Sequence, residues 1–488
     1  MNNNYDRILK QLKSKRNIFI FTEEDLNKLT DEERNKIEER IIRLCKYGIE
    51  SAYEYIPILK NQNVEKLLQD NEIDNLLPES KNLIIIYMYI RTKKVEYLEK
   101  LDEEKINARQ LTLLLKYYNL NKENQQLILK INNLINSNKK YKNLVKIITN
   151  TYKNDDFENI DTSLITNGIL GFAVGDALGV PVEFTTRSAR KQSPISEMIG
   201  YGSHNVPEGT WSDDTSMTIC TMDSIIENQK INYEDMMTKF CLWAKNANYT
   251  ATDEVFDIGI TTRMALSNYY SRKTPAINCG MSDERSNGNG SLMRMLPIAM
   301  YLYANKFTEE EEVKIINDTS SLTHSHEISK LGCKIYCDYM KEILKGRNPI
   351  IAYEIIQRHN YKKYYSIDSI NNYSRLLQGN IKKVGEYEIS SSGYIVSTLE
   401  AAIWCTLNSN SYEESVKKAV NLGDDTDTIG AIVGGINGCI YHNKDIPSRW
   451  LSKLRKKTEI ENLAIKYAEI LNIIRKNTSK NQEQIIRR

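Results

Sequence analysis

The spacing of hydrophobic positions predicts helices along the whole chain. In residues 1–160, apolar residues recur three and four positions apart in short segments separated by polar loops. This spacing is typical of amphipathic helices, which we expect at 31–47, 82–100, 108–118 and 123–137. After residue 163 the apolar runs also show no strand-like alternation of any length. The pattern therefore predicts an all-α protein.

The helices expected after residue 163 differ from the earlier ones because they are built on small residues. Glycines recur every four residues in GFAVGDALG (171–179) and again in GAIVGGINGC (430–439). A glycine inside a helix is unfavourable by about 1 kcal/mol relative to alanine, so six glycines at this spacing predict a packing role. We expect two central helices that cross closely and support a buried site.

The composition changes abruptly near residue 160. Of 22 glycines only Gly48 precedes residue 168, and no histidine precedes His204. A chain of 488 residues is also too long for one ordinary core. We therefore expect an all-α N-terminal region of unknown function, a second domain and a polar tail. Their predicted bounds are 1–160, 161–478 and 479–488, with an acidic linker at 151–162.

The charge balance and the cysteines exclude several classes of protein. A net charge of +2 gives no sign of a nucleic-acid surface. The longest strongly apolar stretch, 83–90, is far shorter than the roughly 20 residues of a membrane span, and residues 1–16 lack the apolar core of a signal peptide. Eight cysteines without a CxxC pair predict buried free thiols. We expect a cytoplasmic protein that binds neither nucleic acid nor membrane.

Two acidic clusters carry the candidate chemistry. They are Ser212-Asp213-Asp214-Thr215 and Asp424-Asp425-Thr426-Asp427-Thr428, and each opens a helix-like run. One such pair is usually a helix cap, but two clusters of this density are harder to explain in that way. Carboxylates and hydroxyls are hard ligands that suit Mg²⁺ or Mn²⁺ rather than zinc. We therefore expect one shared metal site, with Asp424 as a capping or surface residue.

Five motifs in a fixed order resemble the ADP-ribosylglycohydrolase family, over residues of about 163–475. They are GILGFAVGDALGVPVEF (168–184), GTWSDDTSM (209–217), NGNGSLMRMLPIA (287–299), LTHSHE (322–327) and the segment 392–450, which contains SGYIV and NLGDDTDTIG. Members of this family include the dinitrogenase reductase-activating glycohydrolase and the ADP-ribosyl-arginine and ADP-ribosyl-serine hydrolases. The resemblance implies a compact all-α domain with a two-metal cleft.

The resemblance also implies roles for individual residues. Two divalent cations, Mg²⁺ or Mn²⁺, would be held by Ser212, Asp213, Asp214, Asp425, Asp427 and Thr428. Glu183 would be the general acid/base, although Asp214 could take one proton transfer. The substrate-binding residues would be Gly288, Asn289, Gly290, Ser291, His324, Gly393 and Tyr394. Asp176, Arg294, His326 and Glu327 would have supporting roles, and the NGNG segment would precede a helix beginning near Leu292.

The activity implied is hydrolysis of the glycosidic bond at C1″ of ADP-ribose linked to a protein side chain or a small acceptor. The cations would bind the 2″- and 3″-hydroxyls and hold a water near C1″. Two alternatives stay open: an inactive ADP-ribose-binding or structural relative, and a hydrolase of another ribosylated nucleotide. Residues 1–160 lie outside the resemblance, so we expect them to bind a protein partner or to form an extra helical layer.

Overall fold

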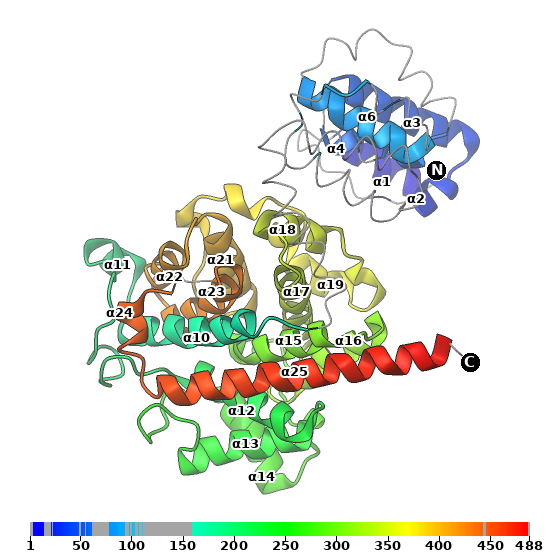
Figure 1. Cartoon of the computed structure of the whole chain (residues 1–488). Coiled ribbons are helices and arrows are strands. Elements are labelled where there is room, and N and C mark those ends of the chain that lie inside the picture. Colours follow the sequence, from blue (N-terminus) through cyan, green and yellow to red (C-terminus); the bar gives the residue numbers. More distant parts are fainter. Residues whose placement is uncertain are drawn as a thin grey trace. The chain divides into compact units, whose positions relative to one another are not determined.

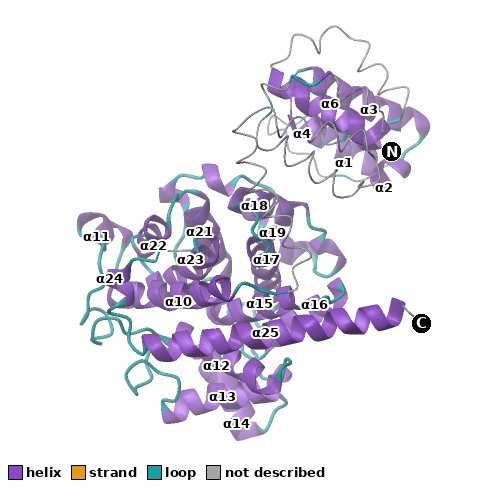
Figure 2. Ribbon diagram, viewed as in Figure 1, coloured by secondary structure: helices purple, strands orange, loops and turns teal. Residues whose placement is uncertain are grey.

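The computed structural model describes residues 3–13, 21, 23–47, 50–53, 55–60, 78–92, 97, 100–102, 106, 110, 159–442 and 446–486. Contacts within the chain divide it into Met1–Asn154 and Asp155–Arg488, and the predicted boundary at 160 lies close to this division. Apart from two isolated bridges, the regular elements of the described residues are helices (Figure 2). The predicted all-α class is therefore confirmed. The helices expected at 108–118 and 123–137 lie outside the described residues.

The first unit contains a small helical core. Its described α-helices are α1 (Asn3–Leu12), α2 (Glu23–Asn27), α3 (Asp31–Lys46), α4 (Glu50–Tyr53) and α6 (Pro78–Thr92). A capping box opens α3, because the N–H of Glu33 donates to Thr30 Oγ1 (3.3 Å) and that of Thr30 to Glu33 Oε2 (3.0 Å). Residues of α3 and α6 share one apolar cluster. The helices predicted at 31–47 and 82–100 correspond to α3 and α6.

The second unit is a helical domain with one continuous apolar core (Figure 1). Its α-helices are α10 (Thr162–Gly179), α11 (Arg187–Gln192), α12 (Asp213–Asn228), α13 (Tyr233–Asn246), α14 (Ile260–Arg272), α15 (Leu296–Ala304), α16 (Glu309–Ser321), α17 (Glu327–Leu344), α18 (Pro349–Arg358), α19 (Ile367–Asn372), α20 (Ser374–Leu377), α21 (Ile395–Leu407), α22 (Tyr412–Val420), α23 (Thr426–Ile440), α24 (Ser448–Leu451) and α25 (Lys457–Ile486). Helix α25 packs along α10, α12 and α15.

Helices α10 and α23 form the centre of this domain, and the two glycine stripes face each other. A Cβ at Gly175 would lie 2.0 Å from the carbonyl oxygen of Gly430, and a Cβ at Gly434 would lie 2.2 Å from that of Gly171. No side chain fits at such distances, so the glycines allow the two backbones to touch. The predicted close crossing of two central helices is what the structure contains.

The crossing fixes where the helix ends lie. A Cβ at Gly179, the last residue of α10, would be 2.4 Å from the Cα of Asp427 in the first turn of α23. The hydroxyl of Thr426 donates to the carbonyl of Gly179 (2.8 Å). The C-terminal end of α10 and the N-terminal end of α23 are therefore locked together, and both carry aspartates.

One helix, at Thr162–Val182, is long and apolar enough to pass a membrane-span test of length and composition, and 83% of its tested window is buried within the protein. It comprises α10 and the 3₁₀ turn that follows it. The segment differs from the uninterrupted apolar stretch at 83–90 because Thr166, Asn167, Asp176 and four glycines separate its large apolar residues.

Helix α25 continues to Ile486, through most of the predicted polar tail at 479–488, because no glycine or proline interrupts residues 457–486. One expected boundary is wrong. The helix expected near Leu292 begins at Leu296, with Pro297 in its first turn. Residues Asn289–Arg294 form a 3₁₀ helix instead.

We predict that Gly175→Ala destabilises the protein by about 2 kcal/mol or more, because the added methyl group meets a backbone carbonyl that cannot move aside. In an unconstrained helix the same substitution would stabilise the protein by about 1 kcal/mol. The sign of the change in the free energy of unfolding therefore distinguishes close backbone packing from an unconstrained helix. Urea unfolding measures it. Gly259→Ala, at the N-cap of α14, is a control for an added methyl group that meets no neighbour, because nothing lies within 4 Å of a Cβ at Gly259. A neutral or stabilising Gly175→Ala would contradict the packing argument.

Candidate functional site

Asp176, in the last turn of α10, holds the first acidic cluster in place. Its Oδ1 accepts the backbone N–H of Ser212 (2.9 Å), and its Oδ2 accepts both the N–H (3.1 Å) and the hydroxyl (2.6 Å) of Thr215. These groups belong to the start of α12, where Ser212 is the N-cap and its own Oγ accepts the N–H of Asp214 (3.3 Å). A buried carboxylate of α10 thus caps α12, which agrees with the supporting role expected for Asp176.

The second acidic cluster lies at the start of α23 and meets the first. Asp425 is the N-cap residue and Asp427 lies in the first turn. The hydroxyl of Thr428 donates to Asp214 Oδ2 (3.3 Å) across the two clusters. Carboxylate oxygens of Asp176, Asp214 and Asp427 lie within 4.8 Å of one another. The clusters, about 210 residues apart in sequence, therefore converge as expected.

Glu183 joins the same group. The 3₁₀ turn Val180–Val182 follows α10, and Glu183 comes directly after it with only 5% of its surface exposed. One of its carboxylate oxygens lies within 4.8 Å of oxygens of Asp425 and Asp427. Although a glutamate in a loop is usually solvated, this one is buried beside the metal-ligand candidates.

Strained backbone supports the loops around the site. Phe184 (φ 61°), Asp257 (φ 60°) and Asp424 (φ 59°) all adopt the left-handed conformation. The N–H of Phe184 donates to the carbonyl of Asp424 (2.7 Å), and the N–H of Asp424 donates to that of Thr185 (2.7 Å). The side chain of Asp424 is exposed and accepts the Ser391 hydroxyl (3.0 Å), which agrees with a surface role.

The two glycine-containing segments expected to bind substrate lie side by side. The N–H of Asn289 donates to the carbonyl of Gly393 (3.0 Å), and Gly288 forms an isolated bridge with Tyr394. The amide of Asn289 also donates to Asp425 Oδ2 (2.6 Å), which links this pair of segments to the acidic group. A Cβ at Gly290 would be 2.8 Å from the ring of His324. Four separate motifs therefore meet at one place.

Several predicted residues turn inward rather than toward this meeting point. Ser291 is fully buried and its hydroxyl faces Cys333 (3.4 Å), so only its backbone is placed to reach a ligand. The buried guanidinium of Arg294 donates to the carbonyl of Thr319 (3.0 Å) and the hydroxyl of Thr323 (2.8 Å). Arg294 thus braces the segment, as expected.

The last two residues of the LTHSHE motif have supporting contacts. His326 caps α17, because its Nδ1 accepts the N–H of Ile328 (3.2 Å). Glu327 accepts hydrogen bonds from Ser366 and Ser369. These contacts agree with the structural roles expected for both residues.

Sequence reasoning missed two residues of the site. His204 Nε2 contacts the carboxylate of Glu183, and Asp257 Oδ1 lies 3.9 Å from the same nitrogen. One oxygen or nitrogen from each of Glu183, His204 and Asp257 lies within 4.8 Å of the others. Both missed residues stand alone in loops, so no periodicity or repeated motif marked them. The only signal was a histidine close to the acidic motif in a chain that has five.

Comparison with known proteins identifies the family of this chain. The sequence model of the ADP-ribosylglycohydrolase family matches residues 159–479. The chain belongs to the ADP-ribosylglycohydrolase family. The resemblance seen in the motifs is thus confirmed, and the chain is a hydrolase acting on glycosyl bonds.

Individual relatives support this membership. The chain is 30% identical to the ADP-ribosylarginine hydrolase Tri1 of Serratia proteamaculans, over 61% of this chain and 76% of that protein. It is 29% identical to the ADP-ribosyl-[dinitrogen reductase] glycohydrolase of Rhodospirillum rubrum, over 60% and 90%. A solved structure described as an ADP-ribosylglycohydrolase-related protein complex matches with a TM-score of 0.53 at 28% identity, covering 64% of this chain and 98% of that one.

The acidic group of this hydrolase gathers carboxyl groups in the protein interior, where burial disfavours their ionised form. Burial and the neighbouring acids Asp257 and Asp425 raise the pKa of Glu183 to about 10. Burial raises the pKa of Asp257 to about 7 and that of Asp176 to about 6. Burial, followed by nearby acidic groups, also raises the pKa of Asp214 well above its usual range. No lysine or arginine among the described residues forms an ion pair with any of these groups.

The unsatisfied oxygens of this group fit a cation site. Asp214 Oδ1, Asp425 Oδ1 and Asp427 Oδ2 are buried atoms without a hydrogen-bond partner among the described residues. Each comes from a different residue, and both clusters contribute. Buried polar atoms are ordinarily hydrogen-bonded, and oxygen-rich donor sets suit hard divalent cations. The hydrolase therefore has acidic clusters that could bind metal ions, as its family does.

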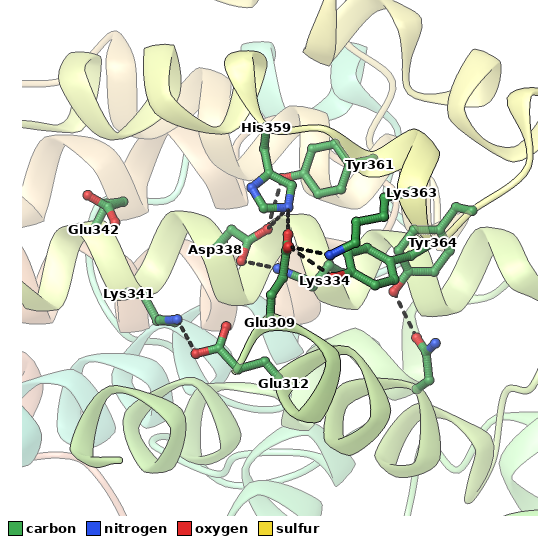
Figure 3. Close-up of polar contacts among 12 residues, drawn as sticks. Glu309, Glu312, Lys334, Asp338, Lys341, Glu342, His359, Tyr361, Lys363 and Tyr364 are labelled. Atoms are coloured by element: carbon green, nitrogen blue, oxygen red, sulfur yellow. Dashed lines mark hydrogen bonds and ion pairs between the residues drawn. The ribbon is translucent and has the colours of Figure 1, made fainter. Parts of the chain in front are cut away.

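A second group of charged side chains lies where α16, α17 and the end of α18 meet (Figure 3). It encloses a cavity of about 160 Å³ lined by Glu309, Glu312, Lys334, Asp338, Lys341, Glu342, Ile355, Ile356 and His359. Lys334 pairs with Asp338 and Lys341 with Glu312. The other acids pair with bases beside the cavity, Glu342 with Lys345 and Arg347, and Glu309 with Lys363. We therefore assign this cluster to holding the three helices together.

We predict a pH dependence of stability that divalent cations diminish. Carboxyl groups with raised pKa values keep protons in the folded protein that the unfolded chain has lost. Their contribution to the free energy of unfolding is complete below the ordinary pKa values of 3.8 for Asp257 and 4.5 for Glu183. This contribution is lost as pH rises through about 7, the raised pKa of Asp257, and on toward about 10, that of Glu183.

Urea unfolding in chelator, compared with unfolding in Mg²⁺ or Mn²⁺, measures this effect. The free energy of unfolding in chelator should fall between about pH 5 and about pH 8, and added cation should flatten the slope because it stabilises the ionised carboxylates. Equal slopes with and without cation would contradict the assignment.

Proposed function

We propose that this chain removes ADP-ribose from modified proteins by hydrolysing the glycosidic bond at C1″, with two divalent cations, Mg²⁺ or Mn²⁺, as cofactors. The observation that supports this most strongly is the convergence of Asp214, Asp425 and Asp427, each with an unpartnered buried oxygen, beside the buried Glu183. The cation ligands we propose are Ser212, Asp213, Asp214, Asp425, Asp427 and Thr428. In this proposal Glu183 acts as general acid/base, and Asp214 is the alternative for one proton transfer.

The protein side chains have separable tasks in such a reaction. When bound, the cations would supply Lewis acidity that lowers the pKa of water and would orient the ribose hydroxyls. Positive charge develops on the sugar in an oxocarbenium-like transition state, and the surrounding carboxylates stabilise it. In this proposal Glu183 transfers the proton that the attacking water loses or the leaving group gains.

The glycine-containing segments are the proposed binding surface for the rest of the ADP-ribose. Gly288, Asn289 and Gly290 offer backbone next to Gly393 and Tyr394, and glycine permits a diphosphate to approach closely. Burial, followed by the nearby Arg294 charge, lowers the pKa of His324 to about 3. The imidazole is therefore neutral, and it would contact the ligand as a hydrogen-bonding group rather than as a charge.

The linkage that we propose to test first is arginine-linked ADP-ribose, because two of the relatives at about 30% identity are named ADP-ribosylarginine hydrolases. Release of ADP-ribose from arginine-, serine- and acetyl-linked substrates separates this proposal from an inactive ADP-ribose binder. Turnover of another ribosylated nucleotide instead would indicate the remaining alternative, a hydrolase of such nucleotides. The decisive experiment measures all of these with one preparation.

We predict that a strong chelator abolishes activity and that Mg²⁺ or Mn²⁺ restores it. Asp425→Asn removes charge without changing volume, so it should weaken cation binding and lower activity by about 10²-fold or more while the helical fold is retained. The matched control is Asp424→Asn: this neighbour is exposed, and asparagine tolerates its left-handed backbone. Full activity in chelator, or equal effects of both substitutions, would contradict the cation site.

We predict that Glu183→Gln lowers kcat by roughly 10²–10⁴-fold, the range expected of general acid–base groups, while KM stays within about tenfold. Glu208→Gln is the control, because Glu208 forms an exposed ion pair with Lys453 (2.8 Å). An unchanged kcat in Glu183→Gln would assign the proton transfer to another carboxylate, with Asp214 the first candidate.

For residues 1–154 we propose a protein-binding role, because the family match begins only at residue 159. We predict that a fragment beginning at Asp155 folds and hydrolyses a small ADP-ribosylated substrate. Its start retains Ile160, whose backbone is hydrogen-bonded by the side chain of Asn472. An insoluble fragment, or one no longer stabilised by Mn²⁺, would mean that the first unit is needed for folding.

We also propose a cytoplasmic location. All eight cysteines are free and buried, which suits a reducing compartment. Fractionation of cells that express the full chain tests this directly.

A further inference from the structure

The imidazole of His204 contacts the Glu183 carboxylate from outside the acidic motifs. Its Nε2 meets Glu183 Oε2, and the rings of Phe184 and Phe256 are tilted neighbours of the imidazole, with ring centroids 5.7 Å and 5.0 Å away. The side chain of His204 is 13% exposed. The ring thus packs against two aromatic side chains, and one edge points at the carboxylate.

The loop that carries His204 is built against the Glu183 segment. A Cβ at Gly202 would lie 1.8 Å from the carbonyl oxygen of Pro181, so this position requires glycine. The N–H of Ser203 donates to the same carbonyl (3.0 Å), and its hydroxyl donates to the carbonyl of Glu183 (2.5 Å). The residue that follows His204, Asn205, adopts the left-handed conformation (φ 52°). This backbone places the imidazole at a fixed distance from the carboxylate.

In its ionised form Glu183 needs such a restraint, because the acids around it repel its charge. Asp257, Asp425, Asp213 and Asp176 all disfavour its ionised form. The residue sits in a loop, where a glutamate side chain pushed by like charges would otherwise turn toward solvent. An N–H donor opposes this by holding one oxygen in place.

We propose that His204 is a positioning residue, whose ring N–H holds the Glu183 carboxylate in the orientation that the reaction needs. This inference rests on the proposed function, because it deepens the role of Glu183. Around the imidazole, Asp257 Oδ1 lies 3.9 Å from the same Nε2 and is the other charged group that faces it. His204 acts through Glu183 and has no contact with the reacting atoms in this account.

The test compares two substitutions of His204, and one of them is also made in a Glu183→Gln background. His204→Leu removes the donor, whereas His204→Gln keeps an N–H at a similar reach. We expect His204→Leu to lower kcat by about 10–100-fold, with KM and Mn²⁺ affinity within about threefold, and His204→Gln to restore most of the loss. In a Glu183→Gln background, His204→Leu should have no further effect, since both changes remove the same function.

Three results would overturn the inference. They are wild-type kcat in His204→Leu, an undiminished effect of His204→Leu in the Glu183→Gln background, and an equal loss in Ser203→Ala. The hydroxyl of Ser203 contacts the backbone carbonyl of Glu183 but not its carboxylate. The Ser203→Ala substitution therefore separates loop packing from the imidazole contact. His442→Leu is the control for loss of a histidine far along the sequence.

Crystal structures of the two His204 variants test this inference independently of the proposed function. If the wild-type protein hydrolyses none of the ADP-ribosylated substrates, the proposed function fails on its own. The inference still requires the Glu183 carboxylate to leave its place beside Asp427 in His204→Leu and to keep it in His204→Gln. An unmoved carboxylate in His204→Leu would refute the positioning role whatever the activity.

Discussion

The backbone contact between α10 and α23 is the constraint on which the rest of the catalytic domain depends. The glycines on both helices have no side chains to keep the backbones apart. The backbones of Gly175 and Gly430 are therefore in direct contact. Each glycine weakens its helix, but the close crossing places Asp176 and Asp427 on adjoining helix ends. The acidic site is therefore a consequence of how two helices pack, and α12 is added to it through the cap that Asp176 provides.

The same arrangement buries several carboxyl groups, and no lysine or arginine among the described residues pairs with them. Several carboxylates are buried together, and hydrogen bonds from Asn289, Thr215 and Thr428 satisfy only some of their oxygens. Burying an ionised carboxylate is strongly unfavourable unless the charge is paired. Divalent cations bound by these oxygens would turn an unstable cluster into a stable one, which links the stability of the fold to the chemistry of the site.

Much of this could be predicted from the sequence because it depends on local pattern. Helical periodicity predicted α3 and α6, glycine spacing predicted the central crossing, and the two Asp-rich motifs marked the converging ends of α12 and α23. His204 and Asp257 could not be found in this way, because they reach the site through loop conformations that no periodicity encodes. The left-handed backbone at Asp257 and the contact of Gly202 with Pro181 depend on tertiary packing. For the same reason the sequence did not reveal that Ser291 faces Cys333.

We propose that the oxygens of Asp214, Asp425 and Asp427 hold divalent cations, and anomalous diffraction from crystals grown with Mn²⁺ would locate them. We expect two anomalous peaks, each beside carboxylate oxygens from this group. Crystals without a peak at this position, or with manganese only at the charged cavity between α16, α17 and α18, would contradict it.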